Sequence, residues 1–158
     1  MSAATARTTT QSTQSAPSGI WFDGVDAMLA DARSRLDRIT PYAAYRELLA
    51  RQAILVDIRP AAQRAEEGEV HPVVHPLYVE RNVLEWRFDP RSEARLEQAS
   101  YNARVIVLCQ EGYTSSLAAD ALVRLGVRRA TDVIGGLRAW REAELPLAPE
   151  PVRPSVPA

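Results

Sequence analysis

The chain has 158 residues, of which 46% are hydrophobic and 25% are charged, a composition typical of one soluble globular domain. The formal net charge is −1, so no overall charge draws the protein to nucleic acid or to an anionic membrane, and we expect it to bind neither. All 19 basic residues are arginine, which together with abundant alanine indicates a bacterial coding sequence.

The cysteine and histidine content limits the chemistry that the chain can support. Cys109 is the only cysteine, so it has no internal disulfide partner, and with two histidines it makes a poor metal site. We therefore expect no metal and no cofactor. The chain lacks an apolar run of the roughly 18 residues that span a bilayer and an N-terminal apolar segment typical of signal peptides. A reducing, cytoplasmic location is the expectation.

Composition divides the chain into four segments. Residues 1–19 are rich in Ser, Thr, Ala and Gln, so we expect a disordered N-terminal tail. A helical extension is expected over 20–38, the main domain over 39–145, and a proline-rich tail over 146–158.

Hydrophobic periodicity predicts strands that alternate with helices. A first helix is expected over 24–37 with Asp23 as its cap, and Thr40-Pro41 begins a second helix that runs through Leu49. A helix or turn is expected at 82–86, and helices at 92–98, at 115–125 and after Gly135-Gly136. Strands are expected at 54–57, 77–79, 105–108 and 131–134. The alternation predicts an α/β fold with a parallel sheet and helices on both faces.

The strongest chemical signal lies between Val105 and Ser116. Four apolar residues run directly into Cys109, and a glycine, three hydroxyl residues and a helical pattern follow. This pattern predicts a buried strand, a tight loop and a helix N-terminus, with the thiol first in the loop. Asp57 stands at the end of another predicted strand, and the carboxyl ends of parallel strands are where such folds bind ligands.

A thiol reacts as the thiolate and therefore needs activation near neutral pH. A histidine base is one route, but His71 and His75 lie in a proline-punctuated loop far away in sequence, and a solvated loop is the simpler interpretation. The alternative is the backbone, because loop N–H groups and the positive end of the helix surround the sulfur if Gly112 lets the chain curl. Nearby hydroxyl groups offer further donors. A buried structural cysteine stays open as a third interpretation.

Three segments together resemble rhodanese-type sulfurtransferases. Cys109–Ser115 is similar to the active-site loop of that family, and Leu55–Arg59 is similar to its early strand with an Asp-x-Arg ending. Asp132–Trp140 resembles its C-terminal GG-x-x-x-W motif. The resemblance covers residues 39–145 and implies a small α/β domain with a five-stranded parallel sheet.

The resemblance also implies an activity and its partners. Cys109 would take the outer sulfur of a small donor such as thiosulfate or a persulfide, and pass it to a thiol, to cyanide or to a protein acceptor. Asp57 and Arg59 would brace the scaffold beside the site, which agrees with a structural ion pair. The oligomeric state stays open. By the same resemblance, the persulfide is held by the backbone amides of Gln110, Glu111, Gly112, Tyr113, Thr114 and Ser115.

Departures from the family pattern bear on the substrate. Thiosulfate-using relatives often carry basic residues directly after the cysteine, whereas this chain has Gln110 and Glu111, and an inward-pointing carboxylate would repel the dianion. Arg81 and Arg87 could supply the missing charge, although a surface position is the simpler interpretation of both. A low-turnover sulfur carrier or anion-binding module that acts with a protein partner is therefore the alternative function.

Phosphatases with a related fold use a longer cysteine loop that ends in an arginine, which grips phosphate through two hydrogen bonds. The corresponding positions here are Ser115 and Ser116. The sequence therefore argues against phosphatase activity.

Overall fold

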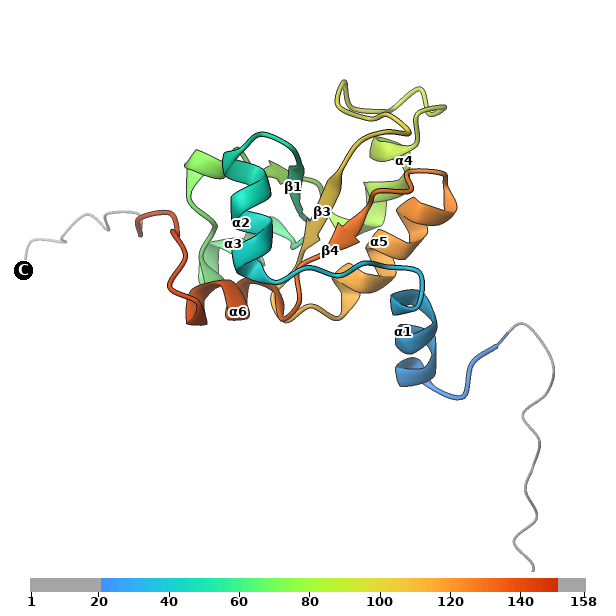
Figure 1. Cartoon of the computed structure of the whole chain (residues 1–158), viewed down its shortest axis with the longest axis horizontal. Helices are drawn as coiled ribbons and strands as arrows, with labels where there is room; N and C mark the ends of the chain where they lie inside the picture. The colour runs from blue at the N-terminus through green and yellow to red at the C-terminus, as the bar shows by residue number, and fades with distance from the viewer. Residues whose placement is uncertain (1–20, 151–158) are drawn as a thin grey trace, which may run out of the picture.

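The computed structural model describes residues 21–150, so the N-terminal tail expected over 1–19 and residues 151–158 lie outside the described part. A four-stranded parallel sheet forms its centre (Figure 1). The strands are β1 (Ile54–Asp57), β2 (Leu77–Tyr78), β3 (Val105–Leu108) and β4 (Thr131–Asp132), in the spatial order β2-β1-β3-β4.

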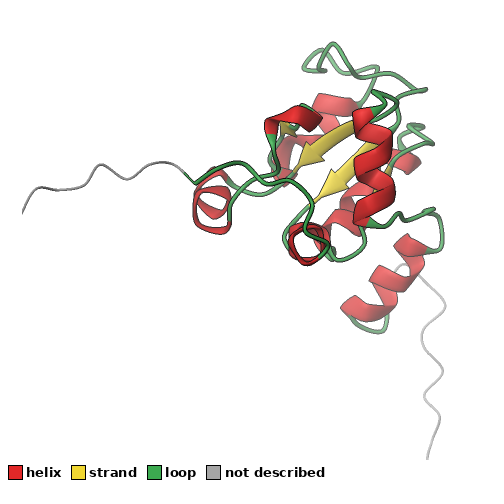
Figure 2. Ribbon diagram, turned by 60° about the vertical axis from the view of Figure 1, so that its left-hand side comes forward, coloured by secondary structure: helices red, strands yellow, loops and turns green. Residues whose placement is uncertain are grey.

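Helices surround this sheet, as Figure 2 shows. Between residues 21 and 150 there are six α-helices, α1 (Val25–Arg33), α2 (Pro41–Leu49), α3 (Ala61–Glu67), α4 (Leu84–Phe88), α5 (Thr114–Arg124) and α6 (Gly136–Glu142). Two 3-10 turns, η1 (Pro72–Val74) and η2 (Arg81–Val83), flank β2. Within this range no helix has the length and apolar character needed to cross a membrane.

The side chains of β3 alternate between two cores. Val107 packs with Leu122 of α5 on one face, and Ile106 packs with Trp140 of α6 on the other. Every β3 residue is buried, which is why the strand reads as a continuous apolar run instead of an alternating one. Helices α2 and α6 cover one face and α4 and α5 cover the other (Figure 1), so the prediction of helices on both faces is confirmed.

The strand order positions the site. From β1 the chain passes to β2 on one side, while β3 pairs with β1 on the other side, with Asp57 opposite Leu108. Parallel sheets open a crevice where neighbouring strands lead their connections apart. The residues that directly follow β1 and β3 therefore meet at one edge of the sheet.

The expectation of five strands is wrong. Ile39 is the residue that comes nearest to a fifth strand, and it forms only an isolated parallel bridge with Val133. The pairing stops at one residue because Thr40 and Pro41 begin α2 at once, with the Thr40 hydroxyl accepting a hydrogen bond from the N–H of Ala43 at 3.2 Å. The helix start predicted at Thr40-Pro41 is thereby confirmed.

The helix expected over 92–98 does not form either. The N–H of Leu96, which a helix would pair with the carbonyl of Ser92, donates instead to the carbonyl of Arg87 at 2.9 Å. The N–H of Arg95 reaches only three residues back, to the carbonyl of Ser92 at 3.3 Å. The segment therefore lacks the bonds to the fourth preceding residue that define an α-helix. The apolar spacing that suggested a helix instead belongs to a turn-rich segment.

Two further helices differ from expectation. Helix α1 ends at Arg33 instead of residue 37, and its N-cap is Gly24 without a side-chain hydrogen bond, so the Asp23 cap is wrong. Helix α3 was not expected at all. None of its residues is buried, so it carries no apolar stripe from which periodicity could detect it.

Candidate active site

Strand β3 delivers Cys109 to the carboxyl edge of the sheet, where the residue is only 5% exposed. The N–H of Gly112 donates a hydrogen bond to the Cys109 sulfur at 3.2 Å. This return of the chain requires the positive φ of Gly112, +81°, which side-chain-bearing residues rarely adopt. Helix α5 begins two residues later, so its positive end also faces this loop. The predicted strand, loop and helix are therefore present.

Most of the loop's N–H groups remain available for a ligand. Within residues 21–150, no backbone carbonyl accepts a hydrogen bond from the N–H groups of five loop residues, namely Gln110, Glu111, Tyr113, Thr114 and Ser115. Unsatisfied N–H groups at a helix start attract anions. The loop is therefore built to surround an anion or a negatively charged sulfur.

Two hydrogen bonds from the start of α6 set the orientation of the loop. The N–H of Leu137 donates to the carbonyl of Cys109 at 2.9 Å, and the N–H of Arg138 donates to the carbonyl of Gln110 at 3.0 Å. Because the C=O and N–H of a trans peptide point in opposite directions, the N–H groups of Gln110 and Glu111 point away from α6. The GG-x-x-x-W segment thus holds the carbonyl groups and leaves the N–H groups free.

The glycines at this junction are needed for close approach. A Cβ atom on Gly112 would lie 2.8 Å from the backbone nitrogen of Gly135, and one on Gly136 would overlap the carbonyl oxygen of Cys109. Both contacts are with backbone, which cannot move aside easily. The Gly135-Gly136 pair is therefore part of the base of the cysteine loop.

The two serines at the start of α5 point away from the sulfur. The hydroxyl groups of Ser115 and Ser116 each donate to the same oxygen of Asp132 at 2.8 Å. Asp132 is fully buried in β4 and also pairs with Arg38 at 2.8 Å. These hydroxyl groups anchor the loop instead of capping α5 or facing an anion.

Asp57 and Arg59, at the end of β1, form the predicted ion pair. Arg59 Nη2 lies 2.7 Å from Asp57 Oδ2, and Nε lies 3.0 Å from Oδ1. The guanidinium also donates to Glu67 at 3.1 Å and to the carbonyl of Gly68 at 2.8 Å. Burial disfavours its charge, but Asp57 and then Glu67 outweigh burial and raise the pKa of Arg59 above its usual value. The donor nitrogens of the Arg59 guanidinium are therefore occupied by neighbouring protein groups.

An open cleft of about 470 Å³ connects these two strand ends. The cysteine loop forms one wall, and the other wall comes from the segment after β1 and from η2. The lining residues are Ile58, Arg59, Pro60, Gln63, Glu67, Arg81, Cys109, Gln110, Glu111, Tyr113 and Thr114. The structure thus brings together the loop and Arg59, which were predicted as site residues, and adds Gln63, which lies on the undetected helix α3.

Neither histidine lies beside the sulfur. His71 begins η1 and accepts a hydrogen bond from the N–H of Val73 at 3.0 Å. His75 contacts Arg51 at 2.9 Å and lines a different hollow. The arrangement therefore favours the backbone over a histidine base. No cluster of three or more His, Cys, Asp or Glu side chains suited to a metal occurs within the described range.

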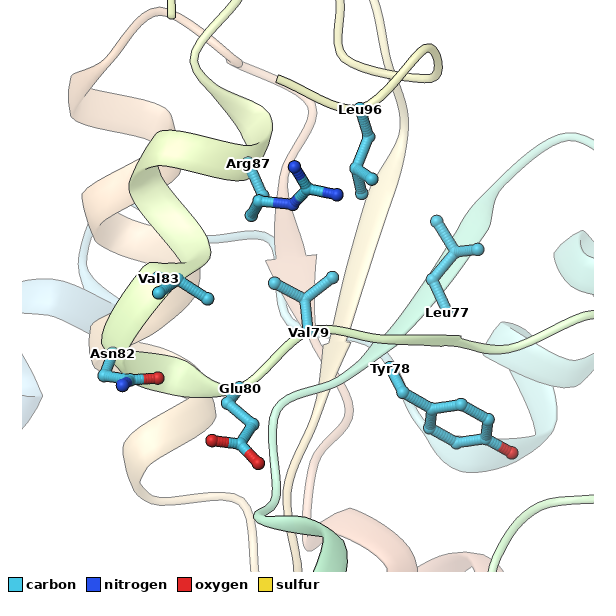
Figure 3. Close-up of a pocket in the computed structure, with 8 residues that line it drawn as sticks. All are labelled: Leu77, Tyr78, Val79, Glu80, Asn82, Val83, Arg87 and Leu96. Atoms are coloured by element: carbon cyan, nitrogen blue, oxygen red, sulfur yellow. The ribbon is translucent and has the colours of Figure 1, made fainter. Parts of the chain in front are cut away.

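The charged residues around the cysteine divide between the cleft and the surface. Arg81 lines the cleft and pairs with Glu85 at 2.5 Å. Glu111 also lines the cleft, but its half-exposed carboxylate lies 3.3 Å from the guanidinium of Arg138. Arg87, the other candidate cation, lines a separate hollow of about 380 Å³. Figure 3 shows Arg87 there, with the side chains of Leu77, Val79 and Leu96 around the same hollow.

Comparison with known proteins gives the family. The family described as Rhodanese-like domain matches residues 40–143. Thiosulfate sulfurtransferase GlpE of Haemophilus influenzae is 32% identical over 109 residues, which cover 69% of this chain and 91% of GlpE. Adenylyltransferase and sulfurtransferase MOCS3-2 of Zea mays is 37% identical over 89 residues, 55% of this chain but only 17% of the maize protein. The chain thus matches about a sixth of that relative.

A solved structure supports the same fold. A protein of unknown function from Rhodopseudomonas palustris, described as a possible tyrosine phosphatase, superposes with a TM-score of 0.71 at 27% identity. The superposition covers 84% of this chain and 99% of that protein. The family match extends over well more than half of the sequence and coincides with the sheet, the cysteine loop and the GG-x-x-x-W segment. The chain belongs to the rhodanese-like domain family.

Proposed function

We propose that the protein is a sulfurtransferase that carries sulfur as a persulfide on Cys109. The observation that carries the proposal is the thiol itself, held at the carboxyl end of β3 with an N–H donor at 3.2 Å from its sulfur, in an open cleft. Thiosulfate sulfurtransferase GlpE of Haemophilus influenzae, a curated relative, aligns with 69% of this chain. In this proposal the functional domain spans 39–145, the segment 20–38 is an extension, and a reducing compartment keeps the thiol free.

The reaction has two displacement steps. The Cys109 thiolate attacks the outer sulfur of thiosulfate, a new sulfur–sulfur bond forms, and sulfite departs with the electron pair of the broken bond. A thiolate or cyanide then attacks the terminal sulfur of the persulfide and leaves as a new persulfide or as thiocyanate. The second step returns Cys109 to the thiolate. Both steps transfer neutral sulfur, so no external oxidant or reductant is needed.

The loop's N–H groups stabilise the negative charge on the sulfur during both steps. The N–H groups of the loop and the start of α5 are fixed before the donor arrives, so they need no reorganisation as charge moves to the terminal sulfur. This role belongs to the amides from Gln110 to Ser115. Asp57 and Arg59 keep the opposite wall of the cleft in place.

Arg81 is the cleft's candidate for docking an anionic donor. Arg59 also lines the cleft, but Asp57, Glu67 and Gly68 occupy its guanidinium. Among residues 21–150, Arg81 has one carboxylate partner, Glu85, and it is more than a third exposed. We expect Arg81→Gln to raise the KM for thiosulfate about threefold to tenfold with little change in kcat, because the contact serves binding. Arg87→Gln, outside the cleft, is the matched control and should leave KM unchanged.

Mass spectrometry of the intact protein tests the function directly. Incubation with thiosulfate should add about 32 Da, the mass of one sulfur, to the wild-type protein, release sulfite, and yield thiocyanate once cyanide is added. The Cys109→Ser variant should show none of these. Wild-type protein that gains no sulfur from thiosulfate, mercaptopyruvate or a small persulfide would contradict the proposal.

The alternative is a sulfur carrier that loads but turns over slowly. Pairing of Arg59 with Glu67 and of Arg81 with Glu85 reduces the attraction of the cleft for a dianion, which favours a persulfide donor delivered by a protein. The same experiment separates the two functions. A stable adduct on Cys109 with negligible thiocyanate formation indicates the carrier.

Phosphatase activity deserves a direct assay because of the description given to the Rhodopseudomonas palustris protein. In this chain, Ser115 and Ser116 stand where a phosphatase loop would carry its arginine, and both hydroxyl groups are bound to Asp132. We expect hydrolysis of p-nitrophenyl phosphate by the wild-type protein to equal that of Cys109→Ser. A difference between the two proteins would overturn this expectation.

A further inference from the structure

Two arginines from the segment before the family match reach the cysteine loop. Arg33, the last residue of α1, donates from Nη2 to the carbonyl of Gly112 at 2.8 Å. Arg38, between α1 and α2, donates from Nη2 to the same carbonyl at 3.1 Å. The family match begins at residue 40, so both arginines lie outside it. One peptide oxygen of the loop thus accepts hydrogen bonds from two cations.

Each arginine has a second contact that fixes its direction. Arg33 Nε donates to the hydroxyl of Ser116 at 3.0 Å, and Arg38 Nε lies 2.8 Å from Asp132 Oδ1. Asp132 in turn accepts from the Ser116 hydroxyl. The two guanidinium groups, the serine and the buried carboxylate form one network beneath the loop. Neither arginine is free to turn away without breaking two hydrogen bonds.

The position of the shared carbonyl gives the network a chemical consequence. The carbonyl of Gly112 and the N–H of Tyr113 belong to the same peptide unit, in which C=O and N–H point in opposite directions. Drawing the oxygen toward the two arginines directs the Tyr113 N–H to the other side of the loop. Hydrogen bonds to a charged group are stronger than neutral ones, and they polarise the peptide so that its N–H becomes a stronger donor.

We propose that Arg33 and Arg38 of the N-terminal extension are positioning residues of the sulfur site, which lock the Gly112–Tyr113 peptide so that its N–H faces the sulfur or the bound anion. The proposal rests on the proposed sulfurtransferase function. It makes the extension a working part of the site, since its removal would take away two of the groups that hold the loop. Arg33 also lies over the ring of Tyr113 at 5.9 Å, on the wall of the same cleft.

Arg35 provides a matched control in the same segment. Its Nε lies 2.7 Å from Asp120 Oδ1, and its Nη2 lies 2.9 Å from the other oxygen, so it ties the extension to α5 as Arg33 does. The described structure shows no contact between Arg35 and the cysteine loop. Arg35→Ala therefore weakens the attachment of the extension without touching the Gly112 carbonyl.

The test is the rate at which thiosulfate loads sulfur onto Cys109 in the full chain, measured by single-turnover sulfite release. Removing a preorganised donor costs about a hundredfold or more, and an indirect support should cost less. We expect about a tenfold loss in the maximal loading rate for Arg33→Ala with an unchanged half-saturating concentration of thiosulfate, and a larger loss for Arg33→Ala combined with Arg38→Gln. Arg33→Lys keeps a charged donor and should recover most of the rate. Arg35→Ala should stay within about twofold of wild type.

Two results would overturn the inference. One is a wild-type loading rate in Arg33→Ala, and the other is an equal loss in Arg35→Ala, which would mean that the arginines only attach the extension. Thermal unfolding of each variant shows whether a lower loading rate comes from misfolding. If Arg33→Ala is misfolded, the loading rate of Arg33→Lys is compared with that of wild type instead.

A separate readout keeps the inference testable if the protein transfers no sulfur. Alkylation of Cys109 by iodoacetamide in the native protein does not depend on any sulfur donor. Its rate should fall in Arg33→Ala and hold in Arg35→Ala, whereas an unchanged or faster rate in Arg33→Ala counts against the positioning role. Failure to load sulfur in the wild-type protein would contradict the proposed function alone.

Discussion

The ends of β1 and β3 are neighbours in the sheet, yet their polar groups differ in how far hydrogen bonds within the protein satisfy them. After β1, the carboxylate of Asp57 and the guanidinium of Arg59 are almost entirely buried and hydrogen-bond each other. After β3, the sulfur of Cys109 has one N–H donor, and the N–H groups around it lack backbone acceptors within the described residues. One strand end is closed and the other is open.

This difference separates scaffold from site. A buried charge needs partners for every polar atom, and a closed cluster therefore serves stability or specificity of the fold. Donors held in place without an acceptor are costly unless a ligand completes them, so their presence around a thiol supports the binding role proposed for this loop. Substitutions at each strand end should therefore have different effects on stability and on reactivity.

Removing the carboxylate at the closed end should have the largest effect on stability. Asp57→Ala leaves the buried guanidinium of Arg59 with Glu67 as its remaining carboxylate, and breaking a buried ion pair from one side costs about 3–5 kcal/mol. Urea denaturation measures the loss. Asp31→Ala removes an exposed partner of Arg35 and should leave the midpoint near that of wild type. A loss in Asp57→Ala no larger than in Asp31→Ala would show that the closed end does not support the fold.

At the open end, a single methyl group should disturb both stability and reactivity. Gly112→Ala places a Cβ at positive φ and 2.8 Å from the nitrogen of Gly135, and left-handed strain alone costs about 1–2 kcal/mol. We expect about 2–3 kcal/mol of destabilisation and a loss of sulfur loading. Gly24→Ala also places a Cβ at positive φ, +88°, with nothing within 4 Å, and should lose stability without losing sulfur loading. Full sulfur loading in Gly112→Ala would show that the geometry of the loop does not depend on glycine at this position.

The smallest effect concerns the rim of the open end. Glu111→Lys replaces a carboxylate that lines the cleft with a cation, and kcat/KM for thiosulfate should rise about twofold to fivefold at low ionic strength. Salt at about 1 M should remove the gain, because it screens exposed charges over about 3 Å. Glu142→Lys changes the other carboxylate near Arg138 by the same charge and serves as the control. Equal gains in both variants would indicate a general charge effect instead of one in the cleft.

Local chemistry explains which features could be predicted. Several features are each encoded within a few residues, so their order and spacing were sufficient to predict them. These are the apolar run of β3, the cysteine, the glycine of the loop and the Gly135-Gly136 turn. The Asp57–Arg59 pair was predictable for the same reason, because its members are two residues apart. The errors also have local causes. Helix α3 has no apolar stripe, and in the segment 92–98 the N–H of Leu96 is bonded to the carbonyl of Arg87 instead of to that of Ser92.

The sequence by itself thus determined the family resemblance, the position of the thiol and the need for a tight loop around it. Tertiary structure alone decided what supports that loop. Arg33 and Arg38 bind the carbonyl of Gly112 from 79 and 74 residues away, and Asp132 of β4 binds the two serines of α5. No local sequence pattern predicts such contacts, because they form only after the parallel sheet has brought the strand ends to one edge and α1 has packed on α5.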